Sequence, residues 1–391
     1  MSSLGNSSKS MDPAAVQRLQ EHIAAEIKAG MYDGCNIVIA RGGEIAINAC
    51  IGSADVKTGR AMSPDDIFYI FSMTKAFTNV LVLKCLETGK LDFTTRVVDV
   101  IPEFNQGDRF RQGKKDMINI LHLLTHRAGL VTTPTPVPYD RLGNLADTIK
   151  AICALDVVGN PGVDVDYSPT LNHALLGEMA RRAMGYASYR EMCNKELFAP
   201  LKMTSTQIGC PESFRARMVP IHAFFPTGGW LKAADIEVMQ EIIDEKAEMP
   251  WVGAVSSVGD IHRFAEMLRR GGELDGVRIL SPAIIDLATT LHTGDKPNNL
   301  YANISRARNW DIPKANFGLG FALAGTGVYP SFFGPVTSPR TFGNYGAGST
   351  LFWIDPKLDM TFACLTASVM EESENIRRFQ RLSTMAAACA I

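Results

Sequence analysis

The strand-like segments of this chain lie near its two ends, and this placement constrains the fold more than any other feature. Near the N-terminus, apolar residues 35–40 and 44–50 flank Arg41-Gly42-Gly43, which predicts a β-hairpin. Strand patterns return late, at residues 317–323, 350–354 and 360–365. From the hairpin to about residue 270 the pattern is mostly helical and broken by loops. Strands at both ends therefore predict an α/β layer built from both termini, with an inserted helical domain.

Three helices are expected beside these strands. The first has Asp12 as its N-cap and Pro13 as its first residue, and it stops at Gly30. The second covers about residues 72–87 and directly follows the strand-like residues 67–71. The third, residues 371–388, closes the chain.

The composition excludes several classes of protein. Of the 391 residues, 46% are hydrophobic and 20% are charged, which is enough for a large core in two closely packed subdomains. The 39 Lys and Arg and the 41 Asp and Glu are interspersed, so no surface for nucleic acid or anionic membrane is expected. The eight cysteines form no C-x-x-C pair, and residues 1–10 lack the apolar run of a secretory signal. We therefore expect a cytoplasmic protein with buried thiols and no membrane span.

The sharpest local motif is Ser72-Met73-Thr74-Lys75, at the predicted start of an apolar helix. A spacing of three places the Lys75 amine within reach of the Ser72 hydroxyl, and the helix N-terminus favours developing negative charge. Burial can lower the pKa of a lysine so that it serves as a base near neutral pH. The alternative is a helix-capping serine followed by a solvated lysine, because about one S-x-x-K is expected by chance in a chain of this length.

Other catalytic patterns are weaker. His122 and His126 stand four residues apart, but no third metal ligand is evident, so capping or core hydrogen bonding is the favoured interpretation and no metal is expected. The glycine pairs at residues 318–320 and 346–348 lack the G-x-G-x-x-G pattern of a nucleotide site, and no G-x-S-x-G nucleophile elbow is present.

Five further segments follow the S-x-x-K in order. They are residues 120–130 (ILHLLTHRAGL), 166–169 (DYSP), 197–203 (LFAPLKM), 256–264 and 342–356 (FGNYGAGSTLFWIDP). Together with Ser72 and Lys75 they make the chain similar to the class C β-lactamase-like group, which includes family VIII carboxylesterases, DD-peptidases and statin-type acyltransferases. The resemblance covers almost the whole chain. It implies a β-lactamase/DD-peptidase-like α+β sandwich, in which an antiparallel sheet is flanked by helices.

The resemblance also implies the domains and the roles of site residues. Residues 11–75 and 251–391 would form the sheet domain, and residues 76–250 a mostly helical domain that carries Tyr167. Ser72 would be the nucleophile, Lys75 and Tyr167 the proton-transfer pair, and the N–H groups of Ser72 and Ala347 the oxyanion hole. The implied substrate contacts are Asn344, Tyr345, Gly346 and Pro169.

Two positions depart from the β-lactamase pattern. Pro169 stands where those enzymes carry an asparagine that holds the antibiotic's amide, and Asn344 stands where a cation or aromatic residue is usual. Both changes disfavour β-lactams and favour esters. Aromatic residues in two Pro- and Gly-rich segments, 220–230 and 327–339, either line an apolar substrate pocket or anchor loops on the core.

The expected activity is therefore a serine esterase (carboxylesterase) that forms an acyl-Ser72 intermediate and needs no cofactor. Its partner would be a small ester with an apolar acyl or alcohol group, and a homo-oligomer is possible. An acyltransferase, an amidase or a lactonase on the same fold is the alternative within this class of enzymes. A catalytically silent scaffold is the alternative outside it.

Overall fold

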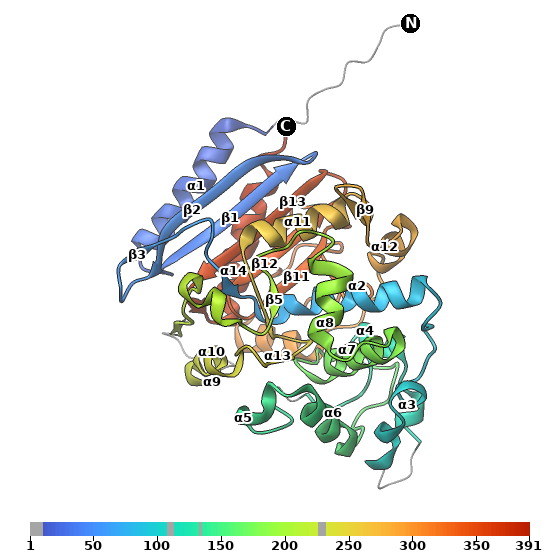
Figure 1. Cartoon of the computed structure of the whole chain (residues 1–391). Coiled ribbons are helices and arrows are strands. Elements are labelled where there is room, and N and C mark those ends of the chain that lie inside the picture. Colours follow the sequence, from blue (N-terminus) through green and yellow to red (C-terminus); the bar gives the residue numbers. More distant parts are fainter. Residues whose placement is uncertain (1–10, 108–112, 133–134, 226–231) are drawn as a thin grey trace, which may run out of the picture.

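The computed structural model describes residues 11–107, 113–132, 135–225 and 232–391. Its main sheet has seven strands in the order β10-β11-β12-β13-β1-β2-β3, and neighbouring strands pair antiparallel. The strands are β1 (Gly34–Arg41), β2 (Glu44–Asp55), β3 (Arg60–Ala61), β10 (Ala322–Leu323), β11 (Phe342–Gly346), β12 (Thr350–Asp355) and β13 (Met360–Ala367). Figure 1 shows the blue N-terminal strands beside the red C-terminal ones. The prediction of one layer built from both termini is confirmed.

The two halves of the sheet join where β1 pairs with β13, from Gly34 opposite Ala367 to Arg41 opposite Met360. The predicted hairpin of β1 and β2 is present, with an irregularity in register between Ile39 and Ala40.

The predicted strand at residues 317–323 is wrong, because only Ala322–Leu323 is a strand. The Gly318 N–H donates to the Phe321 carbonyl over 2.9 Å, and Gly320 has a φ of 82°, so the chain turns here instead of extending.

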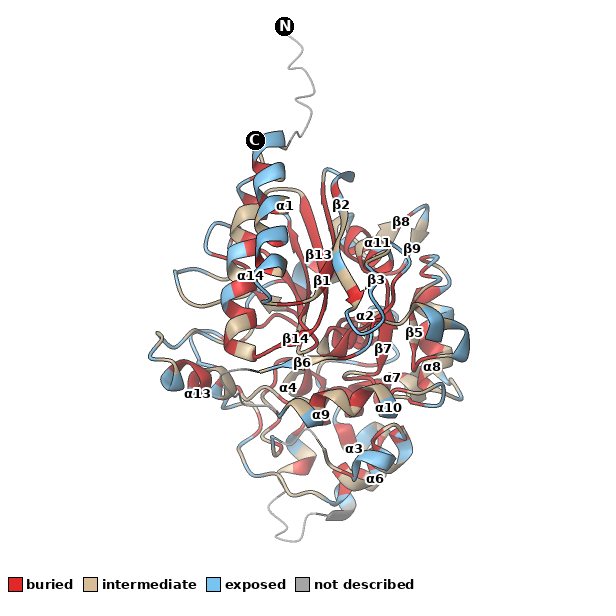
Figure 2. Cartoon of the chain, turned by 90° about the vertical axis from the view of Figure 1, so that its left-hand side faces the viewer, coloured by how far each residue is buried: buried red, intermediate tan, exposed pale blue. Residues whose placement is uncertain are grey.

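One face of the sheet is covered by the two terminal helices, α1 (Pro13–Lys28) and α14 (Glu372–Ala387). They stand to the left of β1 and β13 in Figure 2, with both exposed and buried residues along their length. Leu19 from α1 and Phe379 from α14 are fully buried in the same core as Trp353 of the sheet. Both helices were predicted, and Asp12 caps the first by accepting a hydrogen bond from the Ala14 N–H at 2.9 Å.

The other face packs against α11 (Val258–Arg269), and α2 (Thr74–Glu87) lies between the sheet and the helical part of the chain. Eleven consecutive or near-consecutive residues of α2, from Thr74 to Cys85, are buried. A helix that is buried all round belongs to the centre of a large core. On its far side α2 contacts α7 (Leu171–Met184).

The remaining helices surround this centre. They are α3 (Val97–Val100), α4 (Ile120–Leu124), α5 (Tyr139–Leu142), α6 (Leu145–Ala154), α8 (Tyr189–Cys193), α9 (Ala233–Glu237), α10 (Met239–Ile242), α12 (Pro282–Ala288) and α13 (Asn299–Ala307). The short strands outside the main sheet are β4 (Phe68–Tyr69), β5 (Gln207–Ile208), β6 (Ala223–Phe224), β7 (Ala254–Ser256), β8 (Glu273–Leu274), β9 (Val277–Arg278) and β14 (Val369–Met370). In the described parts of the chain, no helix is both long and apolar enough to cross a membrane.

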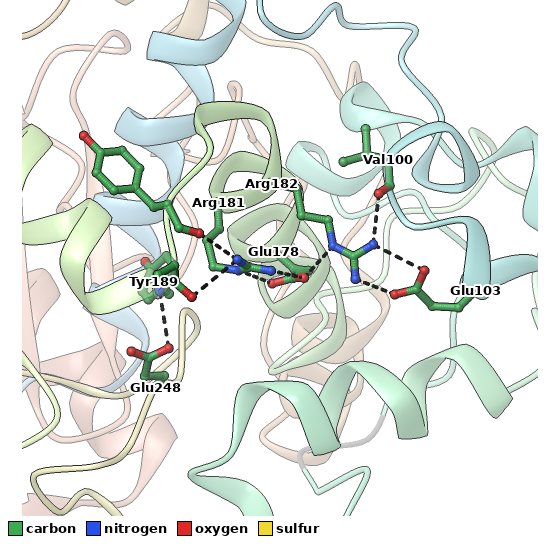
Figure 3. Close-up of polar contacts among 9 residues, drawn as sticks. Val100, Glu103, Glu178, Arg181, Arg182, Tyr189 and Glu248 are labelled. Atoms are coloured by element: carbon green, nitrogen blue, oxygen red, sulfur yellow. Dashed lines mark hydrogen bonds and ion pairs between the residues drawn. The ribbon is translucent and has the colours of Figure 1, made fainter.

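An ion-pair network fixes α7 to its neighbours (Figure 3). The nearly buried Glu178 accepts from Arg181 at 2.7 Å and from Arg182 at 2.6 Å, and Arg182 also donates to the Val100 carbonyl at 3.1 Å. Glu178, Arg181 and Arg182 border a cavity of about 850 Å³, larger than the one that holds Ser72. Since the charged groups of Glu178, Arg181 and Arg182 satisfy one another, this larger cavity is held by structural ion pairs.

Candidate active site

The candidate nucleophile Ser72 lies in a short 3₁₀ turn, Phe71–Met73, directly before α2. The turn is held on both sides by β7, because the Ile70 N–H donates to the Ala254 carbonyl at 3.2 Å and the Ala254 N–H donates to Thr74 Oγ1 at 3.0 Å. Phe71 has a φ of 48°, a left-handed conformation that is uncommon for a residue with a side chain. Such strain beside a reactive group is typical of a functional site.

Lys75 points from the first turn of α2 toward Ser72. Its Nζ donates to Ser72 Oγ at 2.9 Å and to the Trp251 carbonyl at 3.0 Å. Only 1% of Lys75 is exposed, and this burial holds its pKa well below the usual range for lysine. A neutral amine beside a serine hydroxyl can accept the hydroxyl proton.

Tyr167 reaches the same point from the loop before α7. Its ring centre lies 5.3 Å from Lys75 Nζ. Burial raises the pKa of Tyr167, and a hydrogen bond with Ser72 lowers it. The effect of burial is the larger, so the pKa of Tyr167 lies above the usual value for tyrosine. Tyr167 is therefore a neutral phenol, and the three residues predicted from the motifs come together at one place.

His126 shapes the loop that carries Tyr167, a role that the sequence did not indicate. Its ring lies 4.8 Å from the ring of Tyr167, its Nδ1 accepts from the Ser168 N–H at 3.1 Å, and its carbonyl accepts from the Asp166 N–H at 2.9 Å. Burial and the nearby Lys75 lower the pKa of His126 to about 3, so the ring is neutral. The favoured interpretation of His126 as a hydrogen-bonding core residue fits this arrangement. In the described part of the chain, no three His, Cys, Asp or Glu side chains are arranged to hold a metal ion.

The third motif, at the end of β11, packs its backbone against the nucleophile turn. A Cβ at Gly346 would lie 2.2 Å from the Ile70 carbonyl oxygen, so only glycine permits this approach. Thr350 Oγ1 donates to the same carbonyl at 3.1 Å. The backbone of Ala347, predicted to donate to an oxyanion, follows directly and borders the cavity that contains Ser72.

That cavity has a volume of about 130 Å³. Pro169 and Tyr345, predicted as substrate contacts, both line it. Asn344, also predicted as a contact, lines a neighbouring cavity of about 110 Å³ together with Tyr167 and Tyr345. Tyr345 therefore borders both cavities, whereas Asn344 borders only the one of about 110 Å³.

The aromatic side chains of the two Pro- and Gly-rich segments, 220–230 and 327–339, lie in different environments. Tyr329, Phe332 and Phe333 line the second cavity, as the pocket interpretation requires. Phe224 is 43% exposed, and Trp230 lies outside the described residues.

Glu372 is a site residue that the sequence did not reveal. It is the first residue of α14, a position where an acidic residue usually signals only a helix start. In the structure it lines the Ser72 cavity and accepts from the hydroxyls of Tyr301 at 3.1 Å and Tyr345 at 2.8 Å. Burial raises the pKa of Glu372 to about 7.

Known proteins share the family and the fold of this chain. A family model described as Beta-lactamase matches residues 19–385. The chain belongs to the Beta-lactamase family. Among solved structures, a penicillin-binding protein homologue from Caulobacter crescentus superposes with a TM-score of 0.76 at 22% identity, covering 96% of this chain and 98% of the other. A family VIII carboxylesterase superposes with a TM-score of 0.75 at 21% identity over the same shares. These superpositions confirm the β-lactamase/DD-peptidase-like fold predicted from the motifs.

The curated relatives found by sequence similarity match a shorter part of this chain than the solved structures do. Esterase EstB from Burkholderia gladioli is 30% identical over 198 residues, which are 45% of this chain and 49% of EstB. The chain thus spans about half the length, or less, of the curated relatives that it matches, with shares of 38% and 49% of the relative.

Proposed function

We propose that this protein is a serine esterase that cleaves carboxylic esters through an acyl-Ser72 intermediate. The observation that carries the proposal is the contact of 2.9 Å between Ser72 Oγ and the buried amine of Lys75, with Tyr167 beside both. The esterase EstB among the relatives supports esters as the substrate class.

In the proposed acylation, Ser72 Oγ attacks the ester carbonyl carbon while its proton moves to Lys75 Nζ. Lys75 can accept this proton because burial lowers its pKa, and Tyr167, as a phenol, can pass a proton to the departing alcohol and regain one from Lys75. The N–H groups of Ser72 and Ala347 would stabilise the tetrahedral oxyanion, with a contribution of about 3 to 4 kcal/mol for each donor.

In the proposed deacylation, the same groups work in reverse on a water molecule. Water attacks the acyl carbon and gives its proton to Tyr167, which passes its own proton to Lys75, and Ser72 Oγ leaves as the hydroxyl when it takes a proton from Lys75. The products are a carboxylic acid and the regenerated enzyme. Atoms and protons balance without a cofactor.

The lining of the cavity supports esters over β-lactams. Of the described residues that line it, none is a lysine, arginine or histidine. A β-lactam or a peptide substrate carries a carboxylate that needs such a partner. Pro169, which has no amide to offer, lines the same cavity.

We also propose that the protein works in the cytoplasm. All eight cysteines are free thiols, and seven of the eight are buried. Free thiols persist in a reducing compartment.

The test combines turnover with labelling. We expect the wild-type protein to hydrolyse p-nitrophenyl butyrate and to gain the mass of one adduct from a serine-reactive phosphonate. Ser72→Ala should lose both properties, and Ser53→Ala, a change in strand β2 away from the cavity, should keep both. An adduct on Ser72→Ala, or ester turnover by it, would overturn the assignment of the nucleophile.

The other candidate activities give distinct results. Hydrolysis of nitrocefin that is faster than ester hydrolysis would indicate a β-lactamase. Transfer of the butyryl group to an added alcohol or amine, in preference to water, would indicate an acyltransferase. An inert wild-type protein, with neither adduct nor turnover, would indicate a silent scaffold.

A further inference from the structure

The cavity around Ser72 combines mostly apolar and aromatic side chains with two acidic ones. Two carboxylates, Asp235 and Glu372, line it, and the described lining residues include no basic side chain. Asp235 is half-buried, whereas burial raises the pKa of Glu372, so an ionised Glu372 is costly unless a positive charge enters the cavity.

Glu372 is the better placed of the two acids. Each of its carboxylate oxygens accepts from one phenol, at 3.1 Å from Tyr301 and 2.8 Å from Tyr345. The two phenols orient the carboxylate but do not neutralise it. Since a carboxylate has about four acceptor positions, two remain for a ligand.

The preceding residue, Glu371, is an acid that does form an ion pair, and it can be compared with Glu372. Glu371 forms an ion pair with Arg308 at 3.2 Å and also caps α14. Among the described residues, no basic side chain forms a comparable ion pair with Glu372, and burial raises its pKa to about 7. Above that pH Glu372 is negatively charged, and within the described parts of the chain no ion pair compensates it.

Tyrosine rings line the same cavity as this carboxylate. Tyr139, Tyr167, Tyr301 and Tyr345 all line the cavity. The ring centres of Tyr167 and Tyr301 lie 6.5 Å apart at an angle of 68°, and Tyr345 stacks on Phe332 at 4.0 Å. The second acid, Asp235, accepts a hydrogen bond from the Tyr139 hydroxyl at 2.9 Å, and both residues line the cavity.

An acid framed by tyrosine rings is the arrangement that recognises alkylammonium groups, since the ring faces attract a cation and the apolar rings contact its methyl groups. We propose that the Ser72 cavity binds substrates through an alkylammonium group, with Glu372 as the residue that selects for it. This inference rests on the proposed esterase function, and it makes the preferred substrates esters with a cationic amine in the acyl or alcohol part. Carboxylate-bearing esters are disfavoured by the same charge.

A purely structural role for Glu372 makes a different prediction. If it served only to order Tyr301 and Tyr345, cationic and neutral ligands of the same shape would bind equally. The test therefore compares butyrylcholine, which keeps its charge at every pH, with 3,3-dimethylbutyl butyrate, in which carbon replaces the nitrogen.

Binding is measured by titration calorimetry at pH 8 in the Ser72→Ala background, so that no ester is consumed. We expect butyrylcholine to bind at least about tenfold more tightly than the neutral ester, which corresponds to about 1.4 kcal/mol. Glu372→Gln, which keeps the shape of the side chain and one acceptor oxygen but removes the charge, should reduce the preference to less than about threefold. Glu374→Gln, on the same helix but paired with Arg377 at 3.6 Å, is the matched control and should keep the preference.

Equal binding of the two esters in the Ser72→Ala background would overturn the inference without any Glu372 variant, so a folding defect cannot obscure the result. An undiminished preference in Glu372→Gln would also overturn the role of that residue. Because binding is measured without turnover, the two proposals fail separately. Equal binding together with active hydrolysis of p-nitrophenyl butyrate refutes only the alkylammonium site, whereas selective binding by a protein without turnover refutes only the esterase.

Discussion

Replacing Tyr167 by phenylalanine removes one hydroxyl from the candidate site and leaves the ring in place. The ring contacts His126 at 4.8 Å and Tyr301 at 6.5 Å, and the Tyr167 N–H donates to Asn298 at 3.3 Å, none of which needs the hydroxyl. The loss of one hydrogen bond should lower the free energy of unfolding by about 0.5 to 1.5 kcal/mol. Removal of a group that transfers protons should lower the acylation rate by about 10² to 10⁴, or about 2.7 to 5.4 kcal/mol in activation free energy.

The two effects are separated by measuring each alone. The acylation rate is the single-turnover release of p-nitrophenol from the butyrate ester, and the stability is the midpoint of urea unfolding. Tyr189→Phe is the matched control, because Tyr189 is a buried tyrosine whose hydroxyl lies 2.6 Å from Thr78 Oγ1, away from the cavity. It should lose comparable stability and keep its acylation rate. An acylation rate for Tyr167→Phe within about threefold of wild type would refute the proton-transfer role.

The other predictions concern Lys75, Gly346 at the end of strand β11, and the stability of the protein in acid. Lys75→Met keeps the buried alkyl chain but removes the amine that lies 2.9 Å from Ser72 Oγ, so phosphonylation of Ser72 by the serine-reactive phosphonate should slow by at least about 10². An unchanged labelling rate would exclude Lys75 as the base. Gly346→Ala places a methyl group 2.2 Å from the Ile70 carbonyl, and ester turnover and the urea midpoint should both fall, whereas a fully active variant would show that the strand can move without harm. Burial lowers the pKa of His126 from an ordinary 6.5 to about 3 in the folded protein. Between these two pH values the ring is protonated in the unfolded chain and neutral in the folded protein. The free energy of unfolding therefore decreases as the pH falls. From pH 7 to pH 4 this group should lower the free energy of unfolding by about 3 kcal/mol, and His126→Gln should reduce that slope; equal slopes in both proteins would contradict the assignment.

Local patterns in the sequence predicted the elements that depend on neighbours along the chain. The β1–β2 hairpin, the helix capped by Asp12 and the C-terminal helix all follow from turn residues, caps and apolar periodicity. The Ser72–Lys75 contact belongs to this group, because one helical turn brings residues three apart onto the same face. Tyr167 and Ala347 were located by the order of their motifs, and the structure places both beside Ser72.

The amino-acid sequence was enough to predict the fold family and the sheet built from both ends, and its motifs named Ser72, Lys75 and Tyr167 as the candidate site. Only the tertiary structure decided the properties of the side chains within it. The pKa of Lys75 is low because the residue is buried, and burial depends on packing among segments distant in sequence. Glu372 is the first residue of α14, where an acidic side chain commonly faces solvent, and it lines the cavity here because the hydroxyls of Tyr301 and Tyr345 donate to it. The physical reason is the same in both cases: desolvation and hydrogen bonding arise from contacts between remote segments, which local patterns do not encode.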